Sequence, residues 1–176
     1  MAIVKTINNK TPVQGKQCFL AENAVVTGNV TLGDYCSVWF NAVIRGDVNA
    51  ITIGDRVNIQ DGAIVHGSNE GVPTTIGNGV TIGHNAIVHG CTVEDNVMIG
   101  MGAIVLDGAI VKSNSVVAAG AVVLENTVVE SGSLYAGIPA KKTKDFDEED
   151  LAAELARVAD AYVKYSRIYE EANPKA

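Results

Sequence analysis

The sequence contains few aromatic residues and only three cysteines among its 176 positions. Aromatic residues make up 5% of the chain, while valine, isoleucine, alanine and glycine are abundant, which suits a narrow interior filled by small side chains. The cysteines Cys18, Cys36 and Cys91 are odd in number and widely spaced, so they do not indicate a disulfide framework. We therefore expect a cytoplasmic protein with small buried thiols.

Long apolar runs and extended basic clusters are also missing. No apolar run approaches the roughly 18 residues of a membrane-spanning helix, and the N-terminal stretch MAIVKTINNK lacks the apolar core of a signal peptide. The formal net charge is −7, and the one short basic cluster, Lys141, Lys142 and Lys144, is interpreted as a solvated linker. These absences argue against a membrane protein, a secreted protein and a nucleic-acid-binding protein.

The chain does contain a six-residue repeat of aliphatic residues. It is clearest over residues 76–105, IGNGVTIGHNAIVHGCTVEDNVMIGMGAIV, where the aliphatic positions follow a step of six with one step of five: Ile76, Ile82, Val88, Val93, Ile99 and Val105. Neither a helix nor a single strand has this period, and hexapeptide repeats are typical of a β-helix. Since three hexapeptides make one triangular coil, we expect a single domain whose residues 1–140 form six to seven coils.

The repeat begins at Leu20 and is interrupted twice before it continues to Tyr135. It slips by three residues near 47–50, where we expect a bulge, and it breaks again at the polar stretch 67–75, GSNEGVPTT, where we expect a loop. Residues 1–19 carry turn-forming residues and are expected to form an irregular cap.

The periodicity changes after residue 140 to that of an amphipathic helix, expected over residues 145–172. The apolar positions alternate in steps of four and three: Leu151, Leu155, Val158, Tyr162, Tyr165 and Tyr169. Asp147 is the expected N-cap, followed by an acidic first turn. This helix must pack its single apolar stripe on the flank of the β-helix or on a neighbouring subunit.

Two of the three histidines occupy the same register of consecutive coils. His66 follows Val65 and His89 follows Val88, each at the second position of the third hexapeptide. Adjacent strands lie about 4.8 Å apart, so two stacked imidazoles can converge on one ion at roughly 2.0–2.1 Å per bond. Arg45 occupies the same column one coil lower.

His84 leaves the coil at a different edge. It is the third residue of its hexapeptide and stands above Asp61, so we do not expect it to reach His66 and His89 within one chain. A neighbouring copy could supply it, and a three-fold assembly would then contain three equivalent sites. The alternative is that the histidines are ordinary surface turn residues.

Four motifs together resemble the gamma-class carbonic anhydrases over about residues 15–170: VIRGD at 43–47, NIQDG at 58–62, His66, and IGHNAIVHG at 82–90. This resemblance implies an all-β fold, a left-handed parallel β-helix with a C-terminal α-helix packed on its flank, and a homotrimer. It implies zinc, with iron or cobalt possible, bound by His66 and His89 of one subunit and His84 of the next. The implied activity is that of a lyase, the reversible hydration of carbon dioxide to bicarbonate by a metal-bound hydroxide.

Further residues acquire roles from the same resemblance. It places Arg45, Asp47 and Asp61 at the subunit interface near the metal, where the alternative is a plain inter-strand ion pair. It implies that Gln60 and Asn58 orient metal-bound water or bicarbonate. Tyr162 resembles an active-site tyrosine of the family, with a core tyrosine as the alternative, and Trp39 and Phe40 are expected to pack.

The chain also departs from the family pattern. Val48 and Asn69 stand where the archetype carries glutamates, with Glu70 adjacent, and Lys164 replaces a helix asparagine. These departures predict slow proton transfer. Two other classes remain open: a hexapeptide acyltransferase that uses an acyl-CoA and one histidine as general base, and a non-catalytic, metal-stabilised trimeric scaffold.

Overall fold

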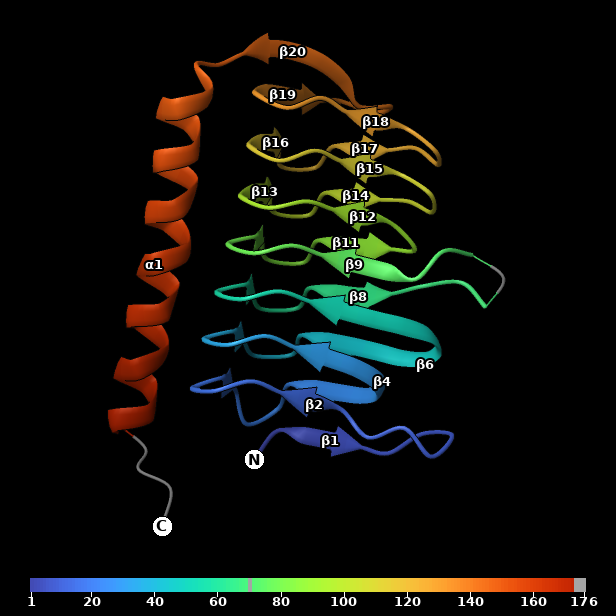
Figure 1. The fold of residues 1–176 in the computed structure, drawn as a ribbon, viewed down its shortest axis with the longest axis vertical. Helices are drawn as coiled ribbons and strands as arrows, with labels where there is room; N and C mark the ends of the chain where they lie inside the picture. The colour runs from blue at the N-terminus through green and yellow to red at the C-terminus, as the bar shows by residue number, and fades with distance from the viewer. Residues whose placement is uncertain (70, 173–176) are drawn as a thin grey trace.

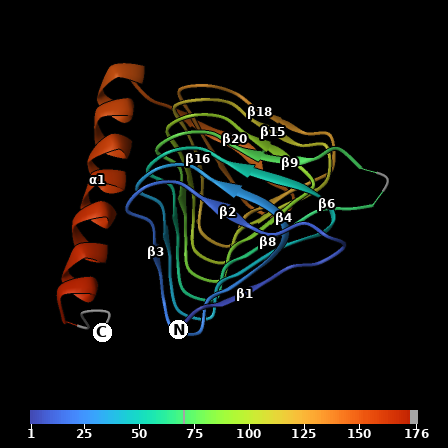
Figure 2. The ribbon, with the colours of Figure 1, turned by 60° about the horizontal axis from the view of Figure 1, so that its bottom comes forward.

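The computed structural model describes residues 1–69 and 71–172 and shows a left-handed parallel β-helix with one helix along its flank (Figure 1). The chain winds in stacked coils, and the strands of successive coils pair in parallel. Viewed obliquely along the stack, the coils enclose a common interior and α1 (Glu148–Ala172) lies outside them (Figure 2). The predicted fold class is confirmed.

The strands form three faces. The face covered by α1 contains β3 (Phe19–Leu20), β5 (Ser37–Val38), β7 (Asn58–Ile59), β10 (Thr81–Ile82), β13 (Val97–Ile99), β16 (Ser115–Val117), β19 (Ser133–Ala136) and β20 (Lys141–Asp145). The second face contains β8 (Ile64–His66), β11 (Ile87–His89), β14 (Ile104–Val105) and β17 (Val122–Val123). The third contains β9 (Thr74–Ile76), β12 (Thr92–Val93), β15 (Ile110–Val111) and β18 (Val128–Val129). Two longer strands, β4 (Val25–Leu32) and β6 (Val43–Ile53), extend over both of these faces, and β1 (Ile3–Lys5) and β2 (Val13–Gln14) pair with β4.

The six-step aliphatic residues line the interior in vertical columns. On the second face the inward column is fully or almost fully buried: Val26, Ile44, Val65, Val88, Val105 and Val123. A coil by itself would expose these side chains above and below, so stability comes from stacking each coil on its neighbours. The repeat therefore predicted both the strands and the direction of their side chains.

Both interruptions of the repeat appear where they were expected. In the pairing of β4 with β6, Gly28 lies opposite Gly46 but Val30 lies opposite Ile51, so residues 47–50 form the expected bulge. The second interruption separates β8, which ends at His66, from β9, which begins at Thr74. Each interruption therefore adds chain next to the histidine column.

Two terminal segments differ from the prediction. Residues 1–19 are not an irregular cap alone, because β1 and β2 extend the parallel sheet below β4. Residues 141–145 are not a linker, because β20 pairs antiparallel with β19 and covers the last coil. Their exposed lysines suit an edge strand, since charged side chains discourage further pairing. The amino-acid composition of these two segments did not indicate that their backbones pair with neighbouring strands.

The helix α1 begins as predicted and packs closely in its middle. The Asp147 carboxylate accepts hydrogen bonds from the backbone N–H groups of Glu149 and Asp150 at 3.0 and 3.1 Å, which is an N-cap. The buried helix residues are Leu151, Leu155, Ala159 and Ser166. Two of them are small, so the helix approaches the sheet closely.

The lower part of the apolar stripe is more exposed. Tyr165 and Tyr169 are 49% and 42% exposed, although the Tyr169 ring still contacts Trp39, with ring centroids 5.2 Å apart. Trp39 itself is buried, as predicted. Within residues 1–69 and 71–172, no helix combines the length and apolar character needed to cross a bilayer.

Candidate metal centre

The side chains of His66 and His89 meet on the second face of the coil. The two residues are register partners in β8 and β11, so their side chains leave the same face one above the other. His66 Nδ1 lies 3.2 Å from His89 Nε2, and the ring centroids are 5.2 Å apart. The structure therefore brings together the two histidines that the register argument placed in one column.

Each of these imidazoles is held from its outer side by a carboxylate. His66 Nε2 lies 3.0 Å from Asp47 Oδ1, and His89 Nδ1 contacts Asp107 Oδ1. An ionised carboxylate only accepts hydrogen bonds, so each outer ring nitrogen carries the proton. In a neutral imidazole the inner nitrogen then has a lone pair, and the two inner nitrogens border the 3.2 Å gap, with Arg45 Nη2 3.5 Å from that of His66. This arrangement favours a cation between the rings.

The geometry fits a metal ion of zinc size. Two nitrogens bound to one tetrahedral zinc at roughly 2.0–2.1 Å lie roughly 3.3–3.4 Å apart, close to the 3.2 Å found here. Histidine ligands of metals almost always donate their other N–H to a carboxylate, a carbonyl or water, and both rings do so. The donor set and its spacing are therefore suited to two ligands of one ion.

The two carboxylates are kept ionised by their partners. Although partial desolvation raises the pKa of Asp47, hydrogen bonds from Arg45 and His66 bring it below its ordinary value. Arg45 Nη1 lies 2.5 Å from Asp47 Oδ2, so these two residues form an ion pair within β6 and not between strands as the alternative expected. Desolvation likewise raises the pKa of Asp107, and hydrogen bonds from Ser68 and His89 lower it below its ordinary value.

Asp107 was missed by the sequence analysis. It lies beyond β14, in the coil above His89, and its backbone neighbour Gly108 donates a hydrogen bond to the Gly90 carbonyl at 2.7 Å. The register could have indicated it, because the residue stacked over Gly90 is adjacent to the column of His89. A polar residue there, above a glycine that leaves space, was the available signal.

His84 lies apart from this pair, as predicted. It follows β10 and stacks over Asp61, with His84 Nδ1 2.9 Å from Asp61 Oδ2. A cleft of about 380 Å³ between this corner and α1 is lined in part by His84, Gln60, Thr81 and Tyr162. The predicted residues Gln60 and Tyr162 are therefore grouped with His84, on the face covered by the helix.

A chain of hydrogen bonds orients Gln60 in this cleft. Gln60 Nε2 donates to Asn58 Oδ1 at 3.0 Å, and Asn58 Nδ2 donates to Thr81 Oγ1 at 2.8 Å. The amide of Gln60 thus turns its nitrogen toward Asn58 and leaves Oε1 as the acceptor on the side of the cleft. Asn58 is only 1% exposed, so it acts on the cleft through Gln60.

Tyr162 contacts both the cleft and the aromatic cluster. Its ring packs edge-on against Trp39, with centroids 5.7 Å apart. Desolvation raises the pKa of Tyr162, and the nearby negative charge of Asp61 raises it further. Its hydroxyl therefore stays protonated at neutral pH and is a hydrogen-bond donor. Both interpretations of this tyrosine, as a packing residue and as a site residue, are compatible with its position.

The residues that depart from the family pattern are exposed. Val48 directly follows Asp47 in β6 and is 41% exposed, and Asn69 lies exposed in the loop after β8. Lys164 is exposed on α1. Glu70, the neighbour of Asn69, lies outside the described residues.

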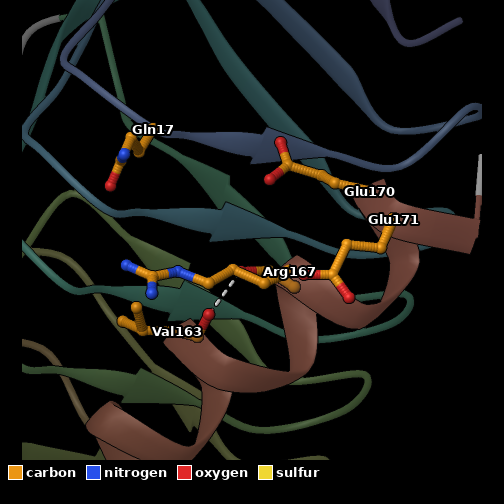
Figure 3. Close-up of a pocket in the computed structure, with 6 residues that line it drawn as sticks. Gln17, Val163, Arg167, Glu170 and Glu171 are labelled. Atoms are coloured by element: carbon orange, nitrogen blue, oxygen red, sulfur yellow. Dashed lines mark hydrogen bonds between the residues drawn. The ribbon is translucent and has the colours of Figure 1, made fainter. Parts of the chain in front are cut away.

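A second cavity lies near the C-terminal end of α1 (Figure 3). It has a volume of about 310 Å³, and its lining includes Gln17, Arg167, Glu170 and Glu171. Ser166 Oγ donates a hydrogen bond to the Val163 carbonyl at 2.9 Å. This hydroxyl is therefore satisfied within the helix and is not directed at a ligand. None of the predicted site residues lines this cavity.

The site residues of the described chain thus fall into two separate groups. Within residues 1–69 and 71–172 no group of three histidine, cysteine, aspartate or glutamate side chains is arranged to hold a metal ion. One group contains His66 and His89 with their carboxylates, and the other contains His84, Gln60 and Tyr162.

Comparison with known proteins identifies the family. A family model described as bacterial transferase hexapeptide (six repeats) matches residues 73–107 and 90–125. The chain is 46% identical over 155 residues to a "probable carbonic anhydrase" of Methanocaldococcus jannaschii, covering 88% of this chain and 96% of that protein. It is 40% identical over 173 residues to gamma carbonic anhydrase 2, mitochondrial, of Arabidopsis thaliana, covering 96% of this chain and 62% of that longer protein.

A solved structure shows the same architecture. The crystal structure of a hexapeptide transferase family protein from Anaplasma phagocytophilum superposes with a TM-score of 0.89 at 38% identity, covering 95% of this chain and 98% of that one. The chain belongs to the gamma-class carbonic anhydrase-like family of hexapeptide-repeat proteins.

Proposed function

We propose that this protein is a metal-dependent carbonic anhydrase that reversibly hydrates carbon dioxide to bicarbonate in a homotrimer. The single observation that carries the proposal is the pair of inner nitrogens of His66 and His89, 3.2 Å apart and each backed by a carboxylate. His84 of a neighbouring copy supplies the third ligand, since His84 of the same chain is grouped with a separate cleft.

An aliphatic stripe beside the histidines supports the assembly. The second face carries an outward column of β-branched residues in register, one residue before the buried column: Val25, Val43, Ile64, Ile87, Ile104 and Val122. Ile64, in the same strand as His66, is 40% exposed. An apolar stripe of this length beside a half-site suits contact with the corresponding helix-covered edge of another copy.

Charged residues border the proposed contact. Arg45 and Asp47 lie next to His66, and Asp61 lies next to His84, so each half-site brings acidic groups to the junction. In the trimer Arg45 then offsets part of this negative charge. In the proposed trimer, Arg45, Asp47 and Asp61 would keep their contacts within one chain and also face the neighbouring chain.

Zinc is the proposed ion, with iron or cobalt as alternatives, since imidazole nitrogens suit all three. A zinc ion held by three histidines supplies an open coordination position and lowers the pKa of water bound there to about 7. His66 and His89 present their inner nitrogens because Asp47 and Asp107 hold the outer ones. His84 is turned by Asp61 in the same manner.

The remaining residues orient the substrate. Because Gln60 Nε2 donates to Asn58, its Oε1 is available as an acceptor. It would accept a hydrogen bond from the O–H of the attacking group or of bicarbonate and so orient that group. The protonated Tyr162 hydroxyl donates a hydrogen bond and favours the negative charge of bicarbonate. The buried pair of Asn58 and Thr81 holds Gln60 in this orientation.

A second candidate is acyl transfer from an acyl-CoA. His84, with Asp61 at 2.9 Å, resembles a general base with its orienting carboxylate, and the adjacent cleft of about 380 Å³ exceeds what carbon dioxide requires. The solved relative from Anaplasma is named a hexapeptide transferase. In this alternative His66 and His89 are dispensable. The scaffold alternative would retain the metal and lack turnover.

The test combines metal analysis with a carbon dioxide hydration assay on the wild type and on His66→Ala, His84→Ala and His89→Ala. We expect each variant to lose bound metal and hydration together, while Glu125→Ala, an exposed turn residue higher on the coil, behaves as wild type. Hydration that persists without metal would contradict the proposal. Acyl transfer lost only in His84→Ala would support the second candidate instead.

A further inference from the structure

The carboxylate of Asp107 joins a metal-ligand candidate to the loop after β8. Its Oδ1 accepts the Nδ1–H of His89, and its Oδ2 accepts the hydroxyl hydrogen of Ser68. These partners come from different coils, 18 and 39 residues away in the sequence. Because both oxygens are engaged, the carboxylate plane has one preferred orientation.

The backbone around His89 leaves room for this contact. Gly90 has a φ of +54°, and a Cβ atom placed on it would lie 2.6 Å from Asp107 Oδ1. A larger residue at position 90 would therefore displace the carboxylate from His89. Gly108 N donates to the Gly90 carbonyl at 2.7 Å, which holds the two turns against each other.

The backbone of Ser68 is itself held by a hydrogen bond. Asn49 Nδ2 donates to the carbonyls of Ser68 and Gly71 at 3.3 and 2.9 Å, and Thr74 Oγ1 donates to the His66 carbonyl at 2.8 Å. The bulge at 47–50 and the loop after β8 thus support each other beside the histidine pair. Ser68 is therefore held in place to fix the Asp107 carboxylate.

We propose that Asp107 is a positioning residue that keeps the proton of His89 on Nδ1 and turns its Nε2 toward His66, with Ser68 fixing the carboxylate. This inference rests on the proposed function only for the identity of the metal ion that His89 Nε2 would bind. The assignment of the tautomer is independent of that ion. Asp107 does not touch substrate in this role and acts only through His89.

The first test reads the tautomer without any metal. The chain contains three histidines, so nitrogen NMR of histidine-labelled, metal-free protein gives few signals to assign. At about pH 8.5 we expect the neutral His89 of the wild type to be in the Nδ1–H form. Asp107→Ala should shift it toward the Nε2–H form, and Asp107→Asn should retain it, because an amide oxygen still accepts from Nδ1–H.

The second test measures zinc affinity by competition with a chromophoric chelator. We expect Asp107→Ala to lose roughly 10–100-fold in zinc affinity, with smaller losses in Asp107→Asn and Ser68→Ala. The control is Asp95→Asn, which removes a negative charge from a turn whose carboxylate contacts Asn78 instead of a histidine. This control should bind zinc as the wild type does.

The outcomes separate the two proposals. If metal-free wild type holds His89 in the Nε2–H form, or if Asp107→Ala changes neither tautomer nor affinity, the inference about Asp107 is overturned. If the tautomer depends on Asp107 but the wild type binds no zinc, the proposed function fails while the positioning role stands. A folded state of each variant is checked by the retained β-sheet circular dichroism signal.

Discussion

Asp61 lies directly beneath His84, with 2.9 Å between Asp61 Oδ2 and His84 Nδ1, and the two residues follow paired strands of consecutive coils. The carboxylate fixes the direction of the imidazole, as Asp47 and Asp107 do for His66 and His89. All three histidines of the chain are therefore paired with an aspartate. A carboxylate partner of this kind is typical of a metal-binding histidine.

The first prediction concerns this aspartate. Asp61→Ala should weaken zinc binding by roughly 10–100-fold, because His84 loses the partner that orients its ring. Zinc affinity measured by chelator competition gives the answer. The matched control is Asp160→Ala, which removes a similarly exposed carboxylate from α1, where it pairs with Arg56. Equal affinities in both variants and the wild type would show that Asp61 does not orient His84 for metal binding.

The second prediction concerns the missing glutamate. With Val48 exposed after Asp47, proton transfer from the site should depend on buffer bases. Val48→Glu should raise kcat by up to roughly 10²-fold at low buffer, since a positioned acid or base typically contributes 10²–10⁴-fold. KM should change little. The control is Val13→Glu, a valine on β2 that is 60% exposed, against 41% for Val48, and lies away from the histidine column.

The outcome of that experiment depends on the wild type as well. Hydration is measured at several buffer concentrations, and a rate that rises with buffer in the wild type but not in Val48→Glu supports the prediction. A fast rate in the wild type that is independent of buffer would show that another group already transfers the proton. Tyr162, whose hydroxyl lies near the cleft, would then be the next residue to substitute.

The third prediction concerns assembly. Ile104→Asp places a charge in the outward aliphatic column of the second face, one coil above His89, and should dissociate the trimer. Metal should be lost with it, because the proposed site needs two copies of the chain. Ile110→Asp is the control, since Ile110 is similarly outward-facing, 38% exposed, and lies on the third face. Sedimentation and metal analysis of both variants check this prediction. An Ile104→Asp variant that stayed trimeric would contradict it.

The fold illustrates which features a repeating sequence makes predictable. The six-step spacing specifies which side chains point inward, and that register alone stacks His89 on His66 and His84 on Asp61. It could not indicate β20, because Lys141–Asp145 pairs through its backbone and has no apolar alternation to mark it. The N-terminal strand β1 was hidden for the same reason, since it is exposed along its length.

The candidate site shows the same division. Contacts within a column follow from the period, but the Asp107 contact with His89 depends on a side chain that crosses from the neighbouring column into the space over Gly90. The grouping of Tyr162 with His84 depends on where α1 packs along the coil, against which Ala159 and Ser166 are buried. Neither distance is encoded in local periodicity.

The fourth prediction concerns the thiol of Cys18. A hydrogen bond from the thiol of Cys36 lowers the pKa of Cys18 from 9.0 to about 7, against the opposing effect of partial burial. Its thiolate fraction therefore rises as the pH increases through about 7. The pKa values of Cys36 and Cys91 are raised, that of Cys91 to about 12 by burial. Cys18 should be the thiol that iodoacetamide alkylates near neutral pH.

Mass spectrometry of alkylation rates against pH checks this expectation. In the wild type the alkylation rate should reach half of its plateau value near pH 7, and the reaction should disappear in Cys18→Ser. Cys36→Ala should move the midpoint upward, because the stabilising hydrogen bond is lost. A midpoint near 9.0 in the wild type would show that Cys36 does not stabilise the thiolate of Cys18.

If one metal site is built from two copies of the chain, then subunits that lack different histidines should complement each other in a mixed trimer. His84→Ala and His89→Ala are co-expressed with different tags, and trimers containing both kinds of subunit are purified for metal analysis. Neither variant alone should hold metal. In a mixed trimer, about one interface joins an intact His84 to an intact pair of His66 and His89. We therefore predict about one metal ion per mixed trimer. Mixed trimers without metal, beside a fully loaded wild type, would contradict the shared site.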